Sequence, residues 1–410
     1  FQKITLSILF ISIIVFISIQ IFPKNPPFKN ELMPLMITVG ALLLSFPMYI
    51  YRSVLRGLDH IHKEQIAEMI GTVFRYIAVI ISLLSGFKII ALSIIFGTAY
   101  FVPSLVAKNF LRKLISSFKI SRLNLDSQTT KNLMKPTTSF LILLLGGTLL
   151  FGIDNIVIGS ILGVEFVPQY AVPMQIIWGV FAMLILFSKV KMPFIAGKHK
   201  EGKFGDLKNT YQTLLFFSMM GASIIIINLI ITGEIIISTW AGAEIFPGRQ
   251  VFYLMLFFLF LWTTRIPADA VLTAAEKHSG YAYMTVIEGV VNATLTILLV
   301  YKMGIQGAII ATILAHLLTN GWFITYKTLK VIKYGIFDFL QWLMKNIVVP
   351  IIVLFTLIFY VSRLDIFVDS STYMQLIICN FLILLFVSLV SKKNILNLVR
   401  TFNDTKLEIK

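Results

Sequence analysis

Several ionisable side chains stand inside long apolar runs of the chain. Arg75, Arg265, Asp269, Glu288 and His316 each lie within a run of about 20 residues, the length that crosses a bilayer. An ionisable group at the centre of a bilayer costs at least about 2.5–3.5 kcal/mol on insertion scales. We therefore expect each of these side chains to have either a partner or a function.

The two arginines are the side chains best suited to hold an anionic substrate. Arg75 lies near the middle of its run, and a guanidinium forks onto a phosphate through two parallel hydrogen bonds. The alternative for Arg75 is a packing role, with carbonyl groups of a neighbouring helix as its partners. Arg265 precedes Asp269 by four residues, so the two can pair along one helix face, and Pro267 between them would kink or loosen that helix. Pairing and substrate binding stay equally open for Arg265.

Four further residues are candidates for binding an ion within the apolar runs. Glu288 precedes Asn292 by four residues on one helix face, and His316 lies in the middle of the next run. Either side chain could bind or relay a proton, although a hydrogen-bonded core histidine is the favoured interpretation of His316. Asp269 and Asp154 complete the set, and Asp154 stands in the outer half of its run, where we expect water to reach it.

Motifs for catalysis, metals and cofactors are missing from the sequence. Cys379 is the single cysteine, which excludes a disulfide framework and a Cys-based zinc site. The segment Gly197–Phe204 nearly matches a phosphate-binding loop, but Phe204 stands where Ser or Thr would hold magnesium. We interpret it as a basic segment at the membrane surface. We therefore expect no catalytic residue, metal or cofactor, and transport driven by an ion gradient or by the gradient of the substrate.

The composition indicates that the chain lies in a membrane. The 410 residues are 58% hydrophobic and 13% charged, with a mean hydropathy of +0.89, which excludes a water-soluble enzyme. The net charge of +16 arises from 35 Lys and Arg against 19 Asp and Glu. In so apolar a chain this excess is typical of loops that face an anionic cytoplasmic leaflet. We expect membrane lipid as a partner, and no nucleic acid.

The apolar runs predict an all-α, polytopic membrane protein with about twelve transmembrane helices, because a membrane barrel would need short alternating segments instead. The expected helices lie at about 4–22, 33–52, 65–84, 87–107, 137–161, 169–190, 212–238, 250–275, 280–301, 304–327, 343–361 and 372–391.

Lysines and arginines orient these helices, because they accumulate in cytoplasmic loops. Most of them fall in alternate loops, in the stretch 108–136 and in the C-terminal tail, which we therefore place in the cytoplasm. The opposite side holds only Lys24, Lys29, Lys88, Arg249, Lys302 and Arg363.

An internal repeat predicts two related halves. One fixed shift of the chain superposes His60 on His278, Gly71 on Gly289 and Gly86 on Gly304, each pair at the same point of a helix–turn–helix unit. Units repeated in the same orientation indicate two lobes related by an axis along the membrane normal.

Three stretches resemble the lipid-linked oligosaccharide flippases, the polysaccharide-exporter branch of the multidrug/oligosaccharidyl-lipid/polysaccharide exporter superfamily. Residues 152–170 resemble the signature of the seventh helix, with the pair Asp154-Asn155, two glycines and Tyr170. Arg52–Leu58 resembles the exit of the fourth helix, and Met303–Ala311 the start of the twelfth.

This resemblance covers nearly the whole chain and implies two six-helix lobes around a central cavity. Under it the chain is a fragment that begins at the third helix, so the first lobe is incomplete. The implied divisions are 1–107 for the rest of the first lobe, 108–136 for a basic cytoplasmic linker, 137–330 for the second lobe, and 331–410 for two additional helices and a cytoplasmic tail.

The function implied by the resemblance is the flipping of an undecaprenyl-diphosphate-linked repeat unit across the bacterial cytoplasmic membrane for surface polysaccharide such as O-antigen. The implied partners are that lipid-linked oligosaccharide and other membrane proteins of polysaccharide assembly. A multidrug antiporter of the same superfamily is the alternative, and two buried arginines argue against its cationic substrates. A polymerase or ligase is a remote alternative, because the outer loops at 23–32, 239–249 and 362–371 are short and hold no histidine. A scaffold without transport activity stays open.

Overall fold

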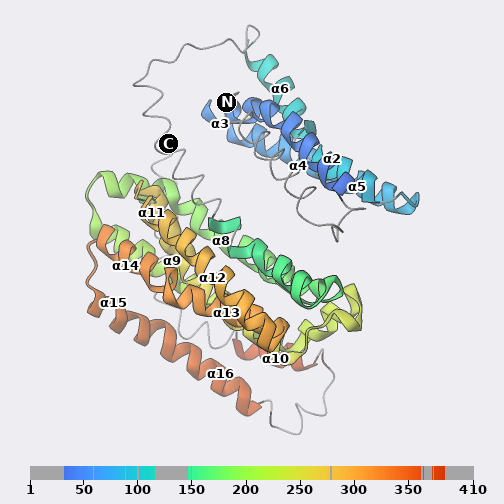
Figure 1. Cartoon of the computed structure of the whole chain (residues 1–410). Coiled ribbons are helices and arrows are strands. Elements are labelled where there is room, and N and C mark those ends of the chain that lie inside the picture. The colour runs from blue at the N-terminus through green and yellow to red at the C-terminus, as the bar shows by residue number, and fades with distance from the viewer. Residues whose placement is uncertain are drawn as a thin grey trace. The chain divides into compact units, whose positions relative to one another are not determined.

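The structure confirms an all-α, polytopic protein. This computed structural model describes residues 32–58, 60–87, 89–98, 101–115, 146–148, 150–277, 279–361, 363, 372 and 374–383. All regular structure within these ranges is helical (Figure 1). Eight of the described helical spans are long and apolar enough to cross a membrane. The expected helix at 4–22, His278, most of the 108–136 stretch and the C-terminal tail lie outside the described residues.

The chain divides into two compact units, Phe1–Asn124 and Leu125–Lys410, and the division falls inside the stretch expected to link two lobes. The described elements of the first unit are α2 (Leu32–Ser45), the 3₁₀ turn η1 (Phe46–Tyr49), α3 (Ile50–Gly57), α4 (Ile61–Leu84), α5 (Ile89–Gly97) and α6 (Phe101–Leu114). Helix α6 therefore continues into the start of the expected linker.

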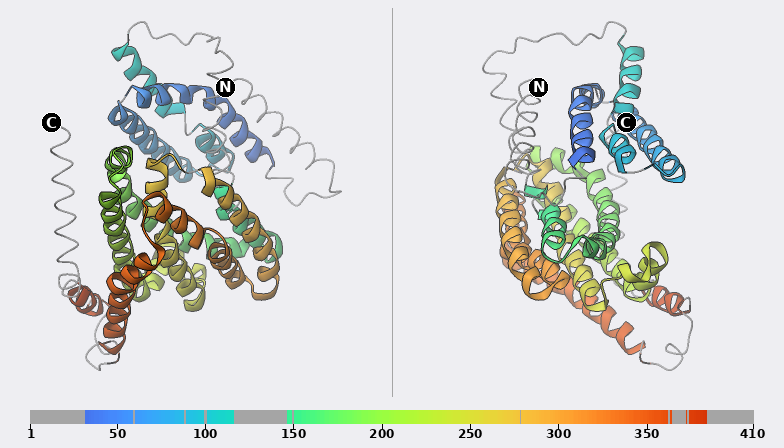
Figure 2. Two further views of the ribbon diagram at one scale, coloured as in Figure 1. Left: turned by 90° about the vertical axis from the view of Figure 1, so that its left-hand side faces the viewer. Right: turned by 45° about the vertical axis from the view of Figure 1, so that its right-hand side comes forward.

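The second unit is a larger bundle (Figures 1 and 2). Its described elements are a helix at Gly146–Ile161, η2 (Val164–Phe166), α8 (Val167–Lys200), α9 (Phe204–Ala241), η3 (Ala243–Ile245), α10 (Arg249–Thr263), α11 (Arg265–Ala274), α12 (Ser279–Met303), α13 (Ile305–Leu318), α14 (Asn320–Val331), α15 (Ile336–Leu343), a π-helical segment (Met344–Val348) and α16 (Val349–Val361), followed by an apolar helix at Met374–Ile383.

Helices α8 and α9 are longer than the apolar runs that predicted them, at 34 and 38 residues. Their polar ends project beyond those runs and meet at a short turn after Lys200. The basic segment Gly197–Phe204 is thus the end of one helix, this turn and the start of the next, and it forms no phosphate-binding loop.

Several expected single helices are broken, and proline explains most of the breaks. Pro267 lacks the N–H that would bond the carbonyl of Thr263, and α10 ends at that residue. Pro47 lies in the 3₁₀ turn between α2 and α3, and Pro350 follows the π-helical segment.

The break between α13 and α14 contains no proline. Thr319 adopts φ −125° and ψ −99°, which is not helical, and its hydroxyl donates to Ala315 O at 2.6 Å. Asn320 and Gly321 follow, and both residue types weaken a helix interior. A Cβ on Gly321 would lie 2.8 Å from His316 O, so the chain passes too close there for any larger residue.

The matched glycines of the internal repeat have the same conformation. Gly86 follows α4 with φ +72°, and Gly304 follows α12 with φ +61°. Glycine adopts this left-handed region without a steric penalty, so each lets a membrane helix turn back on itself. The hairpins α4–α5 and α12–α13 are therefore built alike, while a relation between two whole lobes stays a prediction.

Packing of the second unit aligns its two broken spans. Helix α10 packs against α13, α11 packs against α14, and α12 contacts both α13 and α14. The breaks at Thr264 and Thr319 thus lie at the same level of the bundle, since Arg265 and Asn320, the residues that follow them, both contact Glu288 of α12.

The α12–α13 hairpin supplies a test of this packing. A Cβ on Gly307 would lie 2.2 Å from the backbone oxygen of Leu299, whereas one on Gly179 of α8 would meet nothing within 4 Å. Gly307→Ala should destabilise the protein by about 1–3 kcal/mol through overpacking, and Gly179→Ala should stabilise it by about 0.5–1 kcal/mol. Unfolding in mixed detergent micelles measures both, and equal stability of the two variants would contradict the close contact.

Candidate functional site

The two helix breaks gather polar side chains around Glu288. Arg265 is the first residue of α11, His316 lies in the last turn of α13, and Asn320 is the first residue of α14. Glu288 projects from the middle of the unbroken α12 and is 0% exposed. The breaks therefore position an arginine, a histidine and an asparagine around one buried carboxylate.

Each oxygen of the Glu288 carboxylate has a partner. Arg265 Nη1 donates to Oε2 at 3.1 Å, and Asn320 Nδ2 donates to the same oxygen at 2.7 Å. His316 Nδ1 lies 2.8 Å from Oε1. A carboxylate taken from water into a bilayer requires such donors, because desolvation disfavours the charged form. The network therefore allows Glu288 to be buried as an anion.

Arg265 is held by a second set of contacts. Its Nη2 donates to Thr285 Oγ1 at 3.1 Å, and Asn320 Nδ2 donates to the same hydroxyl at 3.0 Å. The guanidinium carbon lies 4.4 Å from the centre of the Trp262 ring, which also lies 4.8 Å from the His316 ring. A cation over the indole face gains a further attraction that strengthens in a desolvated site.

Two buried polar atoms of this network are unsatisfied. His316 Nε2 and Asn320 Oδ1 have no hydrogen-bond partner among the described residues. An unmatched buried polar group is costly, so the network gains by taking up a further donor or acceptor. Such capacity suits a site that exchanges a proton, an ion or a polar ligand group.

Asp154 forms a second buried cluster, and the structure does not bear out the expected exposure to water. This carboxylate is only 2% exposed. It accepts hydrogen bonds from Tyr170 at 2.8 Å and from Asn292, Thr296 and Thr312 at 3.0 Å each. Four donors from α8, α12 and α13 thus converge on it.

The two clusters share one seam between α12 and α13. Glu288, Asn292 and Thr296 recur every four residues on α12, and Thr312 and His316 do so on α13, so each set follows one helix face. Asn292 and Thr312 bond Asp154, and one turn away Glu288 and His316 bond each other. The same two helices therefore carry residues of both clusters.

Asp269 and Arg75, the other predicted site residues, make no hydrogen bond to Glu288 or Asp154 among the described residues. Asp269 accepts a hydrogen bond from the hydroxyl of Tyr281. Arg265 forms its ion pair with Glu288, so pairing with Asp269 along one helix face does not explain it. Arg75 belongs to the first unit, on α4, where its Nε has no hydrogen-bond partner among the described residues and its guanidinium lies 5.4 Å from the Tyr76 ring.

Sequence reasoning missed the neutral members of the network. Thr285, Thr296, Thr312 and Asn320 carry no charge, and threonines are common in apolar helices. The spacing of polar residues at intervals of four on neighbouring runs was the signal that could have found them. The described residues contain no group of three or more His, Cys, Asp or Glu that could hold a metal ion.

Comparison with known proteins gives an informative similarity to a solved structure. The sequence matches no protein-family description and no curated protein. Among solved structures, the lipid II flippase MurJ in its inward closed conformation is similar with a TM-score of 0.68 and 14% sequence identity, over 96% of this chain and 83% of that one. The protein therefore shares the fold of that flippase.

Removing one partner of the buried ion pair should be costly. Arg265→Met should destabilise the protein by about 3–5 kcal/mol, because it leaves the Glu288 carboxylate buried without its cation. The double variant Arg265→Met/Glu288→Met should lose less than the sum of the two single variants. Unfolding in mixed micelles measures the cycle.

The exposed pair Arg249–Glu234 is the matched control for this cycle, because both side chains are open to solvent. Arg249→Met should change stability little. If Arg265→Met were as stable as the control, the pair with Glu288 would not support the network.

Proposed function

We propose that the protein flips a lipid-linked oligosaccharide across the bacterial cytoplasmic membrane by alternating access. The substrate that we assign is an undecaprenyl-diphosphate-linked repeat unit for surface polysaccharide, and the C-terminus then lies in the cytoplasm. The buried Arg265–Glu288–His316 network at the level of two helix breaks carries this proposal. The fold supports it, because it is shared with a lipid II flippase.

The network has the chemistry for an anionic head group. A guanidinium presents five donors in a planar fork that matches phosphate, and Arg265 now directs two of its nitrogens to Glu288 and Thr285. A diphosphate is a stronger acceptor set than one carboxylate, so it competes with Glu288 for the guanidinium. Broken helices near the membrane midplane are typical of transporter binding sites.

Competition for Arg265 also provides a coupling step. When the head group takes the guanidinium, Glu288 loses its cationic partner inside the membrane, and the cost of its charge rises. The carboxylate, or His316 bonded to it, then takes up a proton or other cation. Release of the head group restores the ion pair and expels that cation. In this scheme Arg265 binds substrate, and Glu288 and His316 couple an ion.

Asp154 and Asp269 are the further coupling residues in this proposal. The four donors around Asp154 are three hydroxyls and an amide. If the hydroxyls rotate, their oxygens face inward and can ligate a monovalent cation beside the carboxylate. The cluster therefore suits an ion that enters from the α12–α13 seam.

The substrate assignment is tested in cells that still make the repeat unit. Deletion of the gene should cause intact lipid-linked units to accumulate and surface polysaccharide to be lost, as measured by mass spectrometry of lipid extracts. We assign head-group binding also to Arg75 on α4, the other arginine predicted from the sequence to bind substrate. A complementing copy with Arg75→Ala should therefore fail, and Arg75→Lys should restore part of the function, because lysine keeps the charge but lacks the fork.

Arg249→Gln, which removes an exposed arginine, is the matched control and should complement fully. An Arg75→Ala copy that restores wild-type polymer would show that Arg75 does not bind the substrate. Normal lipid-linked units and polymer in the deletion strain would overturn the substrate class, and sensitivity of that strain to cationic dyes would then favour a drug antiporter.

Ion coupling is tested by flipping of a labelled lipid-linked oligosaccharide in vesicles with an imposed proton or sodium gradient. Glu288→Gln and Asp154→Asn should each lower the gradient-driven rate at least tenfold, toward the rate without a gradient, because a neutral amide takes up no cation. Glu244→Gln, which changes an exposed carboxylate on η3, should leave the stimulation intact. Full stimulation in both buried variants would show that neither carboxylate couples the ion.

A further inference from the structure

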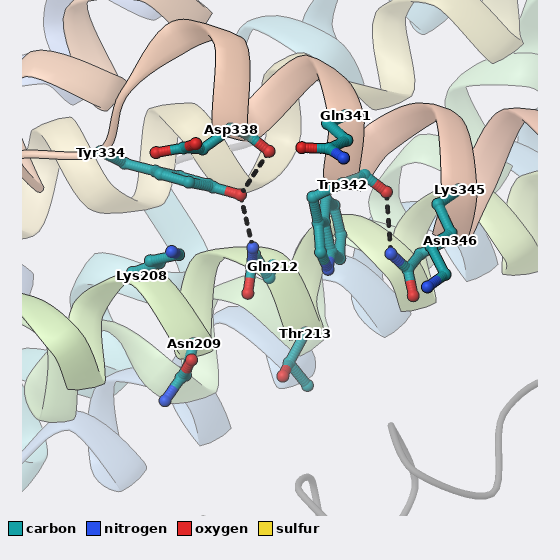
Figure 3. A pocket seen from close by; sticks show the side chains of 10 residues that line it. All are labelled: Lys208, Asn209, Gln212, Thr213, Tyr334, Asp338, Gln341, Trp342, Lys345 and Asn346. Carbon is teal, nitrogen blue, oxygen red and sulfur yellow. Dashed lines mark hydrogen bonds between the residues drawn. The ribbon is translucent and has the colours of Figure 1, made fainter.

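A polar cavity of about 710 Å³ opens between α9 and the α15–π segment (Figure 3). It lies apart from the Glu288 and Asp154 clusters and shares no residue with them. Lys208 and Gln212 line it from the first turns of α9, and Tyr334, Trp342 and Lys345 line it from the opposite wall. Two cations therefore line one open cavity.

The lysines of the cavity have little to neutralise them. Neither Lys208 nor Lys345 forms an ion pair within the part of the chain that the structure describes, where Asp338 is the single carboxylate of the lining. The nitrogen of Lys208 lies 4.2 Å from the centre of the Tyr334 ring. Lys345 lies within a span long enough to cross the membrane, where an ammonium group without a counter-anion is costly.

Hydrogen bonds hold the neutral side chains of one wall of the cavity in place. Gln212 Nε2 donates to the Tyr334 hydroxyl at 2.7 Å, and this hydroxyl donates to Asp338 O at 3.1 Å, which fixes one wall. Burial raises the pKa of Tyr334, so its ring stays neutral beneath Lys208. Lys345 lies in the π-helical turn Met344–Val348 that follows α15, and such turns are frequent at functional sites.

The outer face of α15 is apolar and exposed beside this cavity. Phe337 is 84% exposed, and Leu340 and Met344 follow it at helical spacing with about half of their surface exposed. The polar residues Asp338, Gln341 and Lys345 occupy the neighbouring face, toward the cavity. A charged recess next to an apolar strip matches a molecule with an anionic head and hydrocarbon tails.

We propose that this cavity binds the phosphate of an anionic phospholipid from the surrounding leaflet, with the acyl chains along Phe337 and Leu340. Lys208 and Lys345 hold the phosphate, and Trp342 lines the same cavity, as suits an indole ring, which favours the level of lipid head groups. Bound lipid would join α15 to α9 and so tie the C-terminal spans to the bundle. The proposal does not depend on the flippase activity.

Native mass spectrometry of the purified full chain, with added phosphatidylglycerol or phosphatidylcholine, tests this site. The wild-type protein should bind phosphatidylglycerol in preference. Lys208→Gln/Lys345→Gln should weaken that binding about tenfold or more, because two charge-assisted contacts are lost. Lys345→Gln alone changes an exposed side chain and should give a smaller loss in a fully folded protein.

Lys327→Gln/Lys330→Gln is the matched control, since it removes the same charge from exposed lysines that do not line the cavity. It should bind as the wild type does. Equal binding of phosphatidylglycerol by the wild type and the cavity variant, or an equal loss in the control, would overturn the proposal.

A soluble phosphate ion could bind the same lysines, and two experiments distinguish it from a lipid. Phe337→Ser should weaken binding of phosphatidylglycerol, because it removes part of the apolar strip. Inorganic phosphate at millimolar concentration should not displace the lipid. Displacement by phosphate, together with unchanged lipid binding by Phe337→Ser, would assign the cavity to a soluble anion and overturn the lipid assignment.

Discussion

Burial of charge in a medium that cannot solvate it is the constraint on which the second unit depends. Glu288 is fully buried in the middle of a membrane helix, and its carboxylate is tolerable there only because three other elements supply donors. Those donors must arrive from α11, α13 and α14 at one depth. The ion pair therefore depends on the alignment of the two helix breaks beside α12.

The breaks themselves follow from backbone chemistry. Pro267 has no N–H to donate to the Thr263 carbonyl, and α10 ends at Thr263 while the next helix starts at Arg265. At Thr319 the threonine hydroxyl bonds a carbonyl of the preceding turn instead. In both places the interruption leaves a helix end inside the bundle, where polar side chains and ligands are better accommodated than along a regular helix.

The fold class could be predicted from the sequence, because continuous apolar runs and the unequal distribution of lysine and arginine among the loops can be read along the chain without knowledge of tertiary contacts. The position of the breaks could be foreseen at Pro267 but not at Thr319, where the conformation depends on the neighbours of Asn320 and Gly321.

The sequence also identifies the ionisable groups of the site, Arg265, Glu288 and His316, because they stand in apolar runs. It does not give their mutual contacts, because the rotation of each helix is set by packing. Asp154 was expected to reach water, and Tyr170, Asn292, Thr296 and Thr312 enclose it instead. These donors are far apart in the sequence, and helical periodicity relates only residues that are near one another in the chain.

The shared seam between α12 and α13 gives the two acidic clusters a physical route of communication. Asn292 bonds both Asp154 and the carbonyl of Leu150, and it lies one turn from Glu288 on the same face of α12. A cation held at Asp154 would draw Asn292 and Thr312 out of their present hydrogen bonds, and any resulting rotation of α12 or α13 would change the distances from Glu288 to Arg265 and His316. Because packed helices shift between discrete arrangements rather than deform continuously, occupancy of the Asp154 cluster would then select whether the Arg265 guanidinium stays with Glu288 or is released to an anion.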